Sequence, residues 1–206
     1  MSSKVSLIVI DNFYENPDSI FDNLFDMGFD RAYSPVNSDI GYQKRGRDQW
    51  FASKGTDKSD WIREKFEKII NKKIDKPFWD SNVYWNGRLL VKLENAGMSF
   101  HCHDNKSRGL HDGNDVGPDG WSAVIFMNKK NPLDQGFVTG IVDDEKSLKD
   151  SIFVNPFDVT YDISIGNVYN RCVLFRGNIF HSGADGIGDD IENARIIQGF
   201  FFKEGD

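Results

Sequence analysis

The sequence predicts a mainly β (α+β) fold, a β-sandwich or jelly roll with N-terminal helices packed on one sheet. Many short apolar runs separated by turn signals fill the chain from Val83 onward, and two amphipathic segments precede them. The chain also carries 17 Phe, 5 Trp and 6 Tyr, which suits an aromatic-packed β core. Because 206 residues show no internal repeat and no break in composition, we expect a single domain over residues 1–206.

The first elements are a strand and two helices. Val5–Ile10 is a short continuous apolar run, which predicts a buried strand. Pro17, preceded by a capping asparagine, opens an amphipathic helix over residues 17–27. A second helix follows Ser59, with one apolar and one charged face. Residues 30–58 show no clear period, so we expect a long loop or an irregular edge there.

From Val83 onward the spacing of the apolar residues changes to that of short strands. Turn signals such as Asn86-Gly87 and Asn155-Pro156 separate the runs. The expected strands are Val83–Trp85, Arg88–Leu93, Trp121–Met127, Phe137–Val142, Ile152–Val154, Asp158–Ile163, Cys172–Phe175 and Arg195–Phe202.

Composition narrows the class of protein. The net charge of −7 argues against nucleic acid as a partner, because phosphate contacts need clustered Lys and Arg. No apolar run approaches the ~20 residues that a membrane helix needs, so we expect no membrane partner. Met1–Ser6 is short and polar, so we expect no signal peptide. Two cysteines make no disulfide framework, and we expect a cytoplasmic protein.

The four histidines are the candidate metal ligands. His101, His103 and His111 share one window, and His181 follows a later strand. Two histidines and a carboxylate can occupy one face of the octahedron around Fe(II). Ligands two residues apart point to the same side of a strand, as His101 and His103 would. His103 and Asp104 are adjacent and meet this requirement only if the strand ends in a turn or bulge. The alternative is a polar loop with exposed imidazoles.

The order of these features resembles that of the 2-oxoglutarate- and Fe(II)-dependent oxygenases. The features that carry the resemblance are Gly97, His103 with an acid beside it, the strand Trp121–Asn128, Gly136, Gly140, His181 and Arg195. The opening Val9–Pro17 and the closing stretch Cys172–Phe202 are similar to a poorly characterised branch found in phages and bacteria. The resemblance covers most of the chain and implies a double-stranded β-helix (jelly roll).

The resemblance also implies a ligand set for the metal. His103, Asp104 and His181 would bind Fe(II), with the departure that Asp104 does not stand two residues after His103. A three-histidine site that includes His101 is one alternative. Another is a site around His111, where Gly113 in the acid's place would resemble the iron halogenases.

Arg195 would bind the far carboxylate of 2-oxoglutarate, because a guanidinium makes a bidentate, charge-assisted pair with a carboxylate. The implied function is that of a dioxygenase, a hydroxylase that uses O₂ and acts on a small molecule or a protein side chain. Two other functions stay open: a cupin-like metal-binding jelly roll, which has no use for Arg195, and a metal-free β-sandwich binding module.

Overall fold

The computed structural model describes residues 6–31, 50–81, 85–94, 96, 100–110, 114–129, 136–142 and 153–206. Two antiparallel sheets dominate it, a seven-stranded sheet in the order β1-β8-β5-β10-β4-β3-β2 and a three-stranded sheet in the order β7-β6-β9. The strands are β1 Leu7–Ile10, β2 Phe29–Arg31, β3 Trp50–Ser53, β4 Leu89–Lys92, β5 Trp121–Phe126, β6 Phe137–Val142, β7 Val159–Ile165, β8 Cys172–Arg176, β9 His181–Gly183 and β10 Arg195–Phe202.

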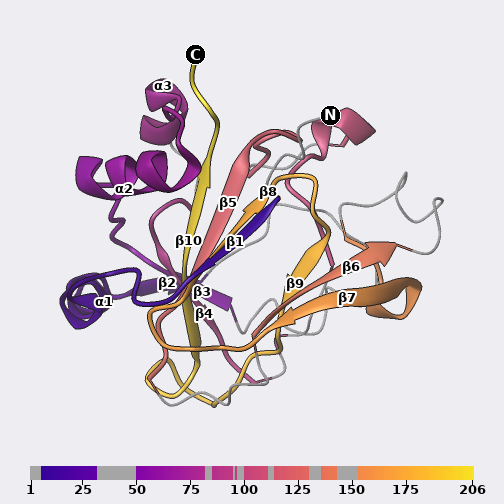
Figure 1. Ribbon diagram of the computed structural model, residues 1–206. Helices are drawn as coiled ribbons and strands as arrows, with labels where there is room; N and C mark the ends of the chain where they lie inside the picture. The colour runs from indigo at the N-terminus through magenta and orange to yellow at the C-terminus, as the bar shows by residue number, and fades with distance from the viewer. Residues whose placement is uncertain are drawn as a thin grey trace.

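The helices lie on one side of the larger sheet and the smaller sheet on the other (Figure 1). They are α1 Pro17–Asp26, α2 Asp60–Ile70 and α3 Lys76–Asp80, with single 3₁₀ turns at Lys106–Arg108 and Pro156–Asp158. Asn16 caps α1 by accepting the Ser19 N–H at 3.3 Å, and Pro17 occupies its first turn. In the part of the chain that the structure describes, no helix has the length and apolar character to cross a bilayer.

The central strands of the larger sheet are buried on both faces, and β10 shows the alternation that this requires. Ile196, Phe200 and Phe202 point to the helices and belong to the main core. There the indole of Trp79 stacks on Phe200, with ring centroids 5.8 Å apart and an interplanar angle of 2°. Ile197 points the other way and packs in a second core with Phe126 and Phe137, between the sheets. The face of β10 that carries Ile197 therefore faces the smaller sheet.

The local sequence signals located most elements. Both helices lie where expected, and Phe137–Val142 and Arg195–Phe202 are strands with the expected bounds. Of the two alternatives for residues 30–58, a long loop or an irregular edge, the described residues fit the second, because β2 and β3 lie at the edge of the larger sheet. Residues 32–49 lie outside the described residues. Four-residue β3 has too short a run to show a period, and its pairing with β4 stabilises it.

Two further short elements were not predicted, α3 and β9. The predicted strand at Val83–Trp85 lies mostly outside the described residues, and Trp85 itself is in a turn. Of the predicted strand Ile152–Val154, Ile152 lies outside the described residues and Val154 forms a single bridge with Phe100.

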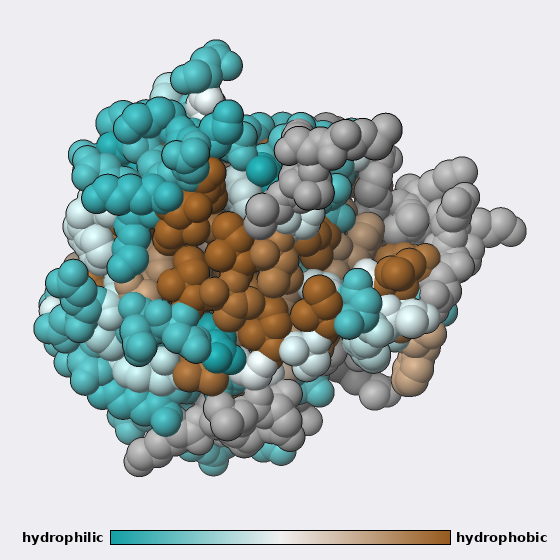
Figure 2. All heavy atoms as spheres, in the orientation of Figure 1, coloured by the Kyte–Doolittle hydropathy of each residue, from teal (hydrophilic) through white to brown (hydrophobic). Residues whose placement is uncertain are grey.

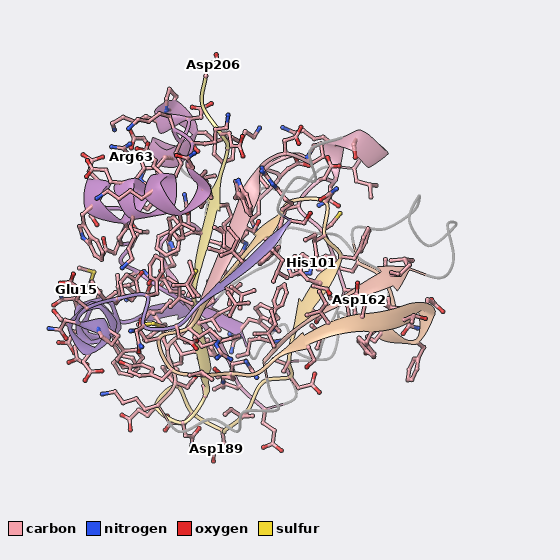
Figure 3. The ribbon with its side chains drawn as sticks, viewed as in Figure 1. Glu15, Arg63, His101, Asp162, Asp189 and Asp206 are labelled. Atoms are coloured by element: carbon pink, nitrogen blue, oxygen red, sulfur yellow. The ribbon has the colours of Figure 1, made fainter. Side chains whose placement is uncertain are left out.

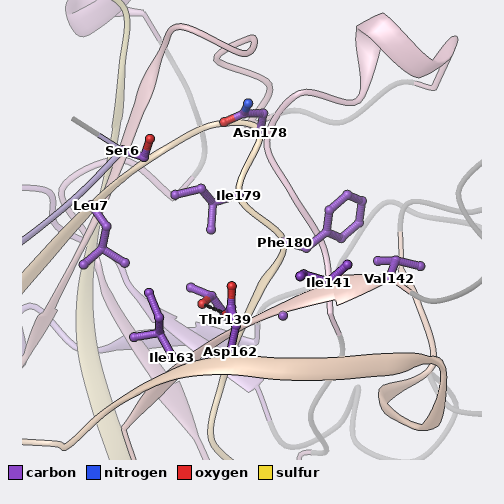
Figure 4. A pocket seen from close by; sticks show the side chains of 11 residues that line it. Ser6, Leu7, Thr139, Ile141, Val142, Asp162, Ile163, Asn178, Ile179 and Phe180 are labelled. Carbon is purple, nitrogen blue, oxygen red and sulfur yellow. Dashed lines mark hydrogen bonds between the residues drawn. The ribbon is translucent and has the colours of Figure 1, made fainter. Parts of the chain in front are cut away.

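An open groove of about 490 Å³ separates β1 from β6 and β7 (Figure 4). Its walls are mainly apolar and include Leu7, Ile163, Ile179 and Phe180, while the Thr139 hydroxyl at its floor bonds to Asp162. Hydrophobic residues also gather across the middle of the visible face, between the helices and the smaller sheet (Figure 2). The edge between β1 and the smaller sheet is thus open to solvent, whereas the second core fills the space further in.

A buried hydrogen bond joins the N-terminal segment to the inner strand β10. The hydroxyl of Tyr14 donates to Oε1 of Gln198 at 2.6 Å, and both side chains are buried. We expect Tyr14→Phe to lower the free energy of unfolding by about 1–2 kcal/mol, because the amide oxygen of Gln198 would lose its donor in a dry environment. Urea denaturation of the variant measures this loss.

Tyr161→Phe is the matched control, because the Tyr161 side chain is 52% exposed. Its effect should stay within about 0.5 kcal/mol. Equal effects of the two substitutions would contradict a stabilising role for the Tyr14–Gln198 bond.

Candidate metal centre

Paired backbone hydrogen bonds bring His101 and His181 together. The His101 N–H donates to the His181 carbonyl at 3.0 Å, and the His181 N–H donates to the His101 carbonyl at 2.9 Å. Residues paired in this way across two antiparallel strands project their side chains to the same side. Their ring centroids are 4.4 Å apart. Figure 3 shows His101 beside β9, in the region of the smaller sheet.

His103 completes the cluster from the same segment as His101. It lies two residues further on, so that an extended backbone places its side chain on the same side. Its N–H donates to the Gly177 carbonyl at 2.7 Å, and its carbonyl accepts from Val116 at 2.9 Å, which fixes the backbone. Its ring centroid is 5.0 Å from each of the other two imidazoles. One nitrogen from each of the three rings lies within 4.8 Å of the others, a spacing that could hold a metal ion.

Aromatic side chains from both sheets enclose the imidazoles of His103 and His181, whereas His101 is half-buried. Phe137 stacks on His181, and the ring centroid of Phe175 lies 4.3 Å from that of His181. The ring centroid of Phe201 on β10 lies 4.9 Å from that of His103. Burial lowers the pKa of both His103 and His181 well below the usual range, and the neighbouring histidines lower it further. Both rings are therefore neutral at neutral pH, which is the form that binds a metal.

A hydrogen bond to the backbone fixes the orientation of the His181 ring. Nδ1 lies 2.9 Å from the carbonyl oxygen of Ile179. Because a carbonyl oxygen only accepts, Nδ1 carries the proton and Nε2 keeps its lone pair. Histidines that bind metals usually donate their second N–H in this way. The donor set of three neutral imidazoles thus suits a transition metal such as Fe(II).

The structure brings together three of the five histidine and acid candidates. His103 and His181 lie in one cluster with His101, whereas the half-buried Asp104 does not join it. The backbone bends at His103, and the carboxylate of the next residue, Asp104, lies outside the group of ligand atoms. His111 and the neighbouring Gly113 lie outside the described residues. The His-x-His spacing was visible in the sequence, but the bridge between His101 and His181 was not.

Arg195 begins β10 and is only 2% exposed. It alternates with Ile196, which faces the helices, so its side chain lies on the face of β10 that looks toward the smaller sheet. Nε donates to the Asp185 carbonyl at 3.0 Å. Burial lowers the pKa of Arg195 to about 10, which leaves the guanidinium charged at neutral pH. The same face of β10 therefore carries a buried cation at one end and Phe201, in contact with His103, near the other.

Comparisons with known proteins identify the fold. No protein-family model and no curated protein sequence matches the chain. Among solved structures, the non-heme alpha ketoglutarate dependent epimerase SnoN from nogalamycin biosynthesis aligns with a TM-score of 0.54 and 11% identity, over 98% of this chain and 79% of its own. HygX from Streptomyces hygroscopicus, with nickel, 2-oxoglutarate and hygromycin B bound, aligns with a TM-score of 0.52 and 10% identity, over 97% of this chain and 83% of its own. At these identities the likeness is one of fold.

The buried imidazoles should make the metal-free protein sensitive to acid. Unfolded histidines take up protons near pH ~6.5, whereas His103 and His181 in the folded chain do so only at lower pH. Below about pH 6.5 the unfolded state therefore binds more protons, and the free energy of unfolding should fall by up to about 1.4 kcal/mol per pH unit for each histidine. Urea denaturation of metal-free protein between about pH 7.5 and pH 5.5 measures this slope.

His103→Gln and His181→Gln serve as the comparison variants. Each should have a shallower slope than the wild type in this window, because glutamine does not titrate. Slopes equal to that of the wild type would show that these two histidines are not held neutral in the folded state.

Proposed function

We propose that the chain is a non-haem Fe(II), 2-oxoglutarate-dependent oxygenase, a hydroxylase-like enzyme formed by a single domain over residues 1–206. The observation that carries the proposal is the convergence of three imidazoles between two sheets, with the buried Arg195 on the facing sheet. The histidines supply a metal site, and Arg195 supplies a fixed cation for an acid that the metal also binds.

The order of the strands supports a double-stranded β-helix. The larger sheet contains β4, β5, β8 and β10, and the smaller sheet contains β6, β7 and β9. From β4 onward the chain passes repeatedly between the two sheets, and the His101 segment joins the smaller one through its bridge to β9. The likeness in fold to SnoN and HygX is also consistent with this architecture.

The ligand set that we propose consists of His101, His103 and His181. It replaces the implied set of His103, Asp104 and His181, because Asp104 lies outside the cluster of ligand atoms. Three neutral imidazoles leave the full charge of Fe(II) uncompensated, whereas a carboxylate ligand would cancel part of it. This site should therefore bind the anionic 2-oxo acid end of 2-oxoglutarate strongly.

The bound iron and 2-oxoglutarate would together supply the oxidising chemistry, with O₂ as the oxidant. The chain's own residues bind, orient and exclude water. The Ile179 carbonyl holds the His181 ring, and Phe137, Phe175 and Phe201 cover the imidazoles. The HygX structure holds hygromycin B together with 2-oxoglutarate, which supports a small molecule rather than a protein side chain as the substrate class.

Alanine substitutions distinguish the possible ligand sets. His101→Ala, His103→Ala and His181→Ala should each weaken Fe(II) binding by more than about 100-fold, because even the loss of an outer partner of a ligand costs ~10–100-fold. Asp104→Ala should retain iron. Iron content after anaerobic loading and desalting is the measurement, with circular dichroism to check folding.

Other patterns would overturn this ligand set. Loss of iron in Asp104→Ala with retention in His101→Ala would restore the set of two histidines and one carboxylate. Loss in His111→Ala alone would move the site elsewhere. Retention of iron by every variant would favour the metal-free binding module.

Arg195→Leu tests the binding of 2-oxoglutarate. Loss of one partner of a buried, hydrogen-bonded charge pair costs about 2–5 kcal/mol, which is roughly 30- to several-thousand-fold in affinity. The variant should therefore bind Fe(II) normally and bind 2-oxoglutarate much more weakly, as measured by anaerobic calorimetric titration.

Arg176→Leu is the matched control. Arg176 lies over the indole of Trp121 and pairs with Glu204 at 2.7 Å, away from the imidazoles. Its loss should leave the affinity for 2-oxoglutarate unchanged. Equal binding by the wild type and Arg195→Leu, or no binding by either, would remove the support for an oxygenase and favour a cupin-like site.

A further inference from the structure

A lysine lies beside Arg195 in the sheet. In the register of the antiparallel pairs, Lys92 of β4 stands opposite Arg195 of β10 on one side and opposite Trp50 of β3 on the other. Residues opposite each other project to the same face, so that Trp50, Lys92 and Arg195 form a row across three strands. Because Arg195 alternates with Ile196 of the helix-side core, this row lies on the face toward the smaller sheet.

Both cationic groups in this row are buried and point to the same loop. Lys92 is 5% and Arg195 2% exposed. The Lys92 ammonium donates to the Ala184 carbonyl at 3.0 Å, and Arg195 Nε donates to the next carbonyl, that of Asp185, at 3.0 Å. The loop that holds them begins directly after β9, the strand that starts with His181.

Backbone contacts with β4 and its C-terminal extension fix this loop in place. Gly186 approaches so closely that a Cβ there would lie 1.8 Å from the Leu93 carbonyl oxygen. The Gly186 N–H donates to the Ala96 carbonyl at 3.0 Å, and the Ile187 N–H donates to the Lys92 carbonyl at 3.3 Å. The positions of the two cationic heads are therefore set by the backbone.

The two cations repel each other. Burial, and next the charge of Arg195, lower the pKa of Lys92 to about 7. Among the described residues, two charged groups act on Lys92: Arg195 on β10, and the exposed carboxylate of Asp185 in the loop, which raises the pKa again. The neighbouring strand β3 contributes the uncharged ring of Trp50, whose centroid lies 4.7 Å from Nζ. Lys92 therefore exchanges its proton near neutral pH, whereas Arg195 stays charged.

We propose that Lys92 is a second binding residue for the far carboxylate of 2-oxoglutarate, and that it takes up one proton from solvent as this carboxylate binds. The proposal rests on the proposed function, in which Arg195 binds the same carboxylate. An anion placed beside both cations offsets their repulsion and favours the ammonium form of Lys92. A neutral amine at Nζ thus gains a proton, and no other bond is made or broken.

Calorimetry measures this proton directly. 2-Oxoglutarate is titrated without O₂ into the Fe(II)-loaded protein in two buffers that differ in ionisation enthalpy. The difference in heat gives the number of protons taken up. We expect close to one proton per molecule bound at about pH 8, roughly half of one near pH 7 and little near pH 6. 2-Oxopentanoate, which lacks the far carboxylate, should cause no uptake.

Two substitutions at Lys92 separate charge from titration. Lys92→Met should bind 2-oxoglutarate roughly 10-fold more weakly and take up no proton. Lys92→Arg keeps a permanent charge, because a guanidinium does not titrate in this range. It should retain affinity within a few-fold and also take up no proton. Lys58→Met is the control. Lys58 is a half-buried lysine beside the helices that also donates to backbone carbonyls, those of Trp79 and Ser81.

Each outcome has one meaning. Proton uptake by Lys92→Arg equal to that of the wild type would overturn the proposal, and so would undiminished uptake by a folded Lys92→Met. Uptake that is lost in both variants and kept in Lys58→Met would support it. If the wild type binds 2-oxoglutarate through Arg195 without any proton uptake, only this inference fails. If the wild type does not bind 2-oxoglutarate at all, the proposed function fails with it.

Discussion

The paired backbone hydrogen bonds between His101 and His181 are the interaction on which the site depends. They join segments that are far apart in the sequence and place two imidazoles on one side of the smaller sheet. His103 then reaches the same point because it lies two residues from His101. The dry surroundings of these rings follow from the same arrangement, since Phe137 and Phe175 close over His181 only where the two sheets face each other. Local sequence alone specifies none of this.

The elements that could be predicted are those with a strong local pattern. The run Arg195–Phe202 and the helix after Asn16 carry apolar periodicity and capping signals within their own residues, and the structure has them as expected. β9 reads His-Ser-Gly, which has no such pattern, and is a strand only because β6 pairs with it. The choice between His101 and Asp104 has the same origin. It depends on the bridge that places His101 beside His181, a partner about eighty residues away in the sequence.

The buried cations show where sequence reasoning succeeds and where it stops. Arg195 was singled out by its place after His181 in the family resemblance, and it begins an apolar run, where a buried charge is costly. Lys92 also follows an apolar run, but a lysine at a strand end usually extends its charged head into water. Only the register of β3, β4 and β10 shows that it is buried beside Arg195.

The two halves of the proposed site belong to different layers of the protein. The imidazoles lie with the smaller sheet, and the cations lie on the larger sheet. A short dicarboxylate bound at both ends would cross-link the two layers. Its affinity would therefore depend on the distance between the two sheets. That distance is set by the inter-sheet core around Phe126, Phe137 and Ile197. A change of volume in this core could therefore alter ligand binding by moving the two layers relative to each other, because small displacements of fixed binding groups carry a large energetic cost.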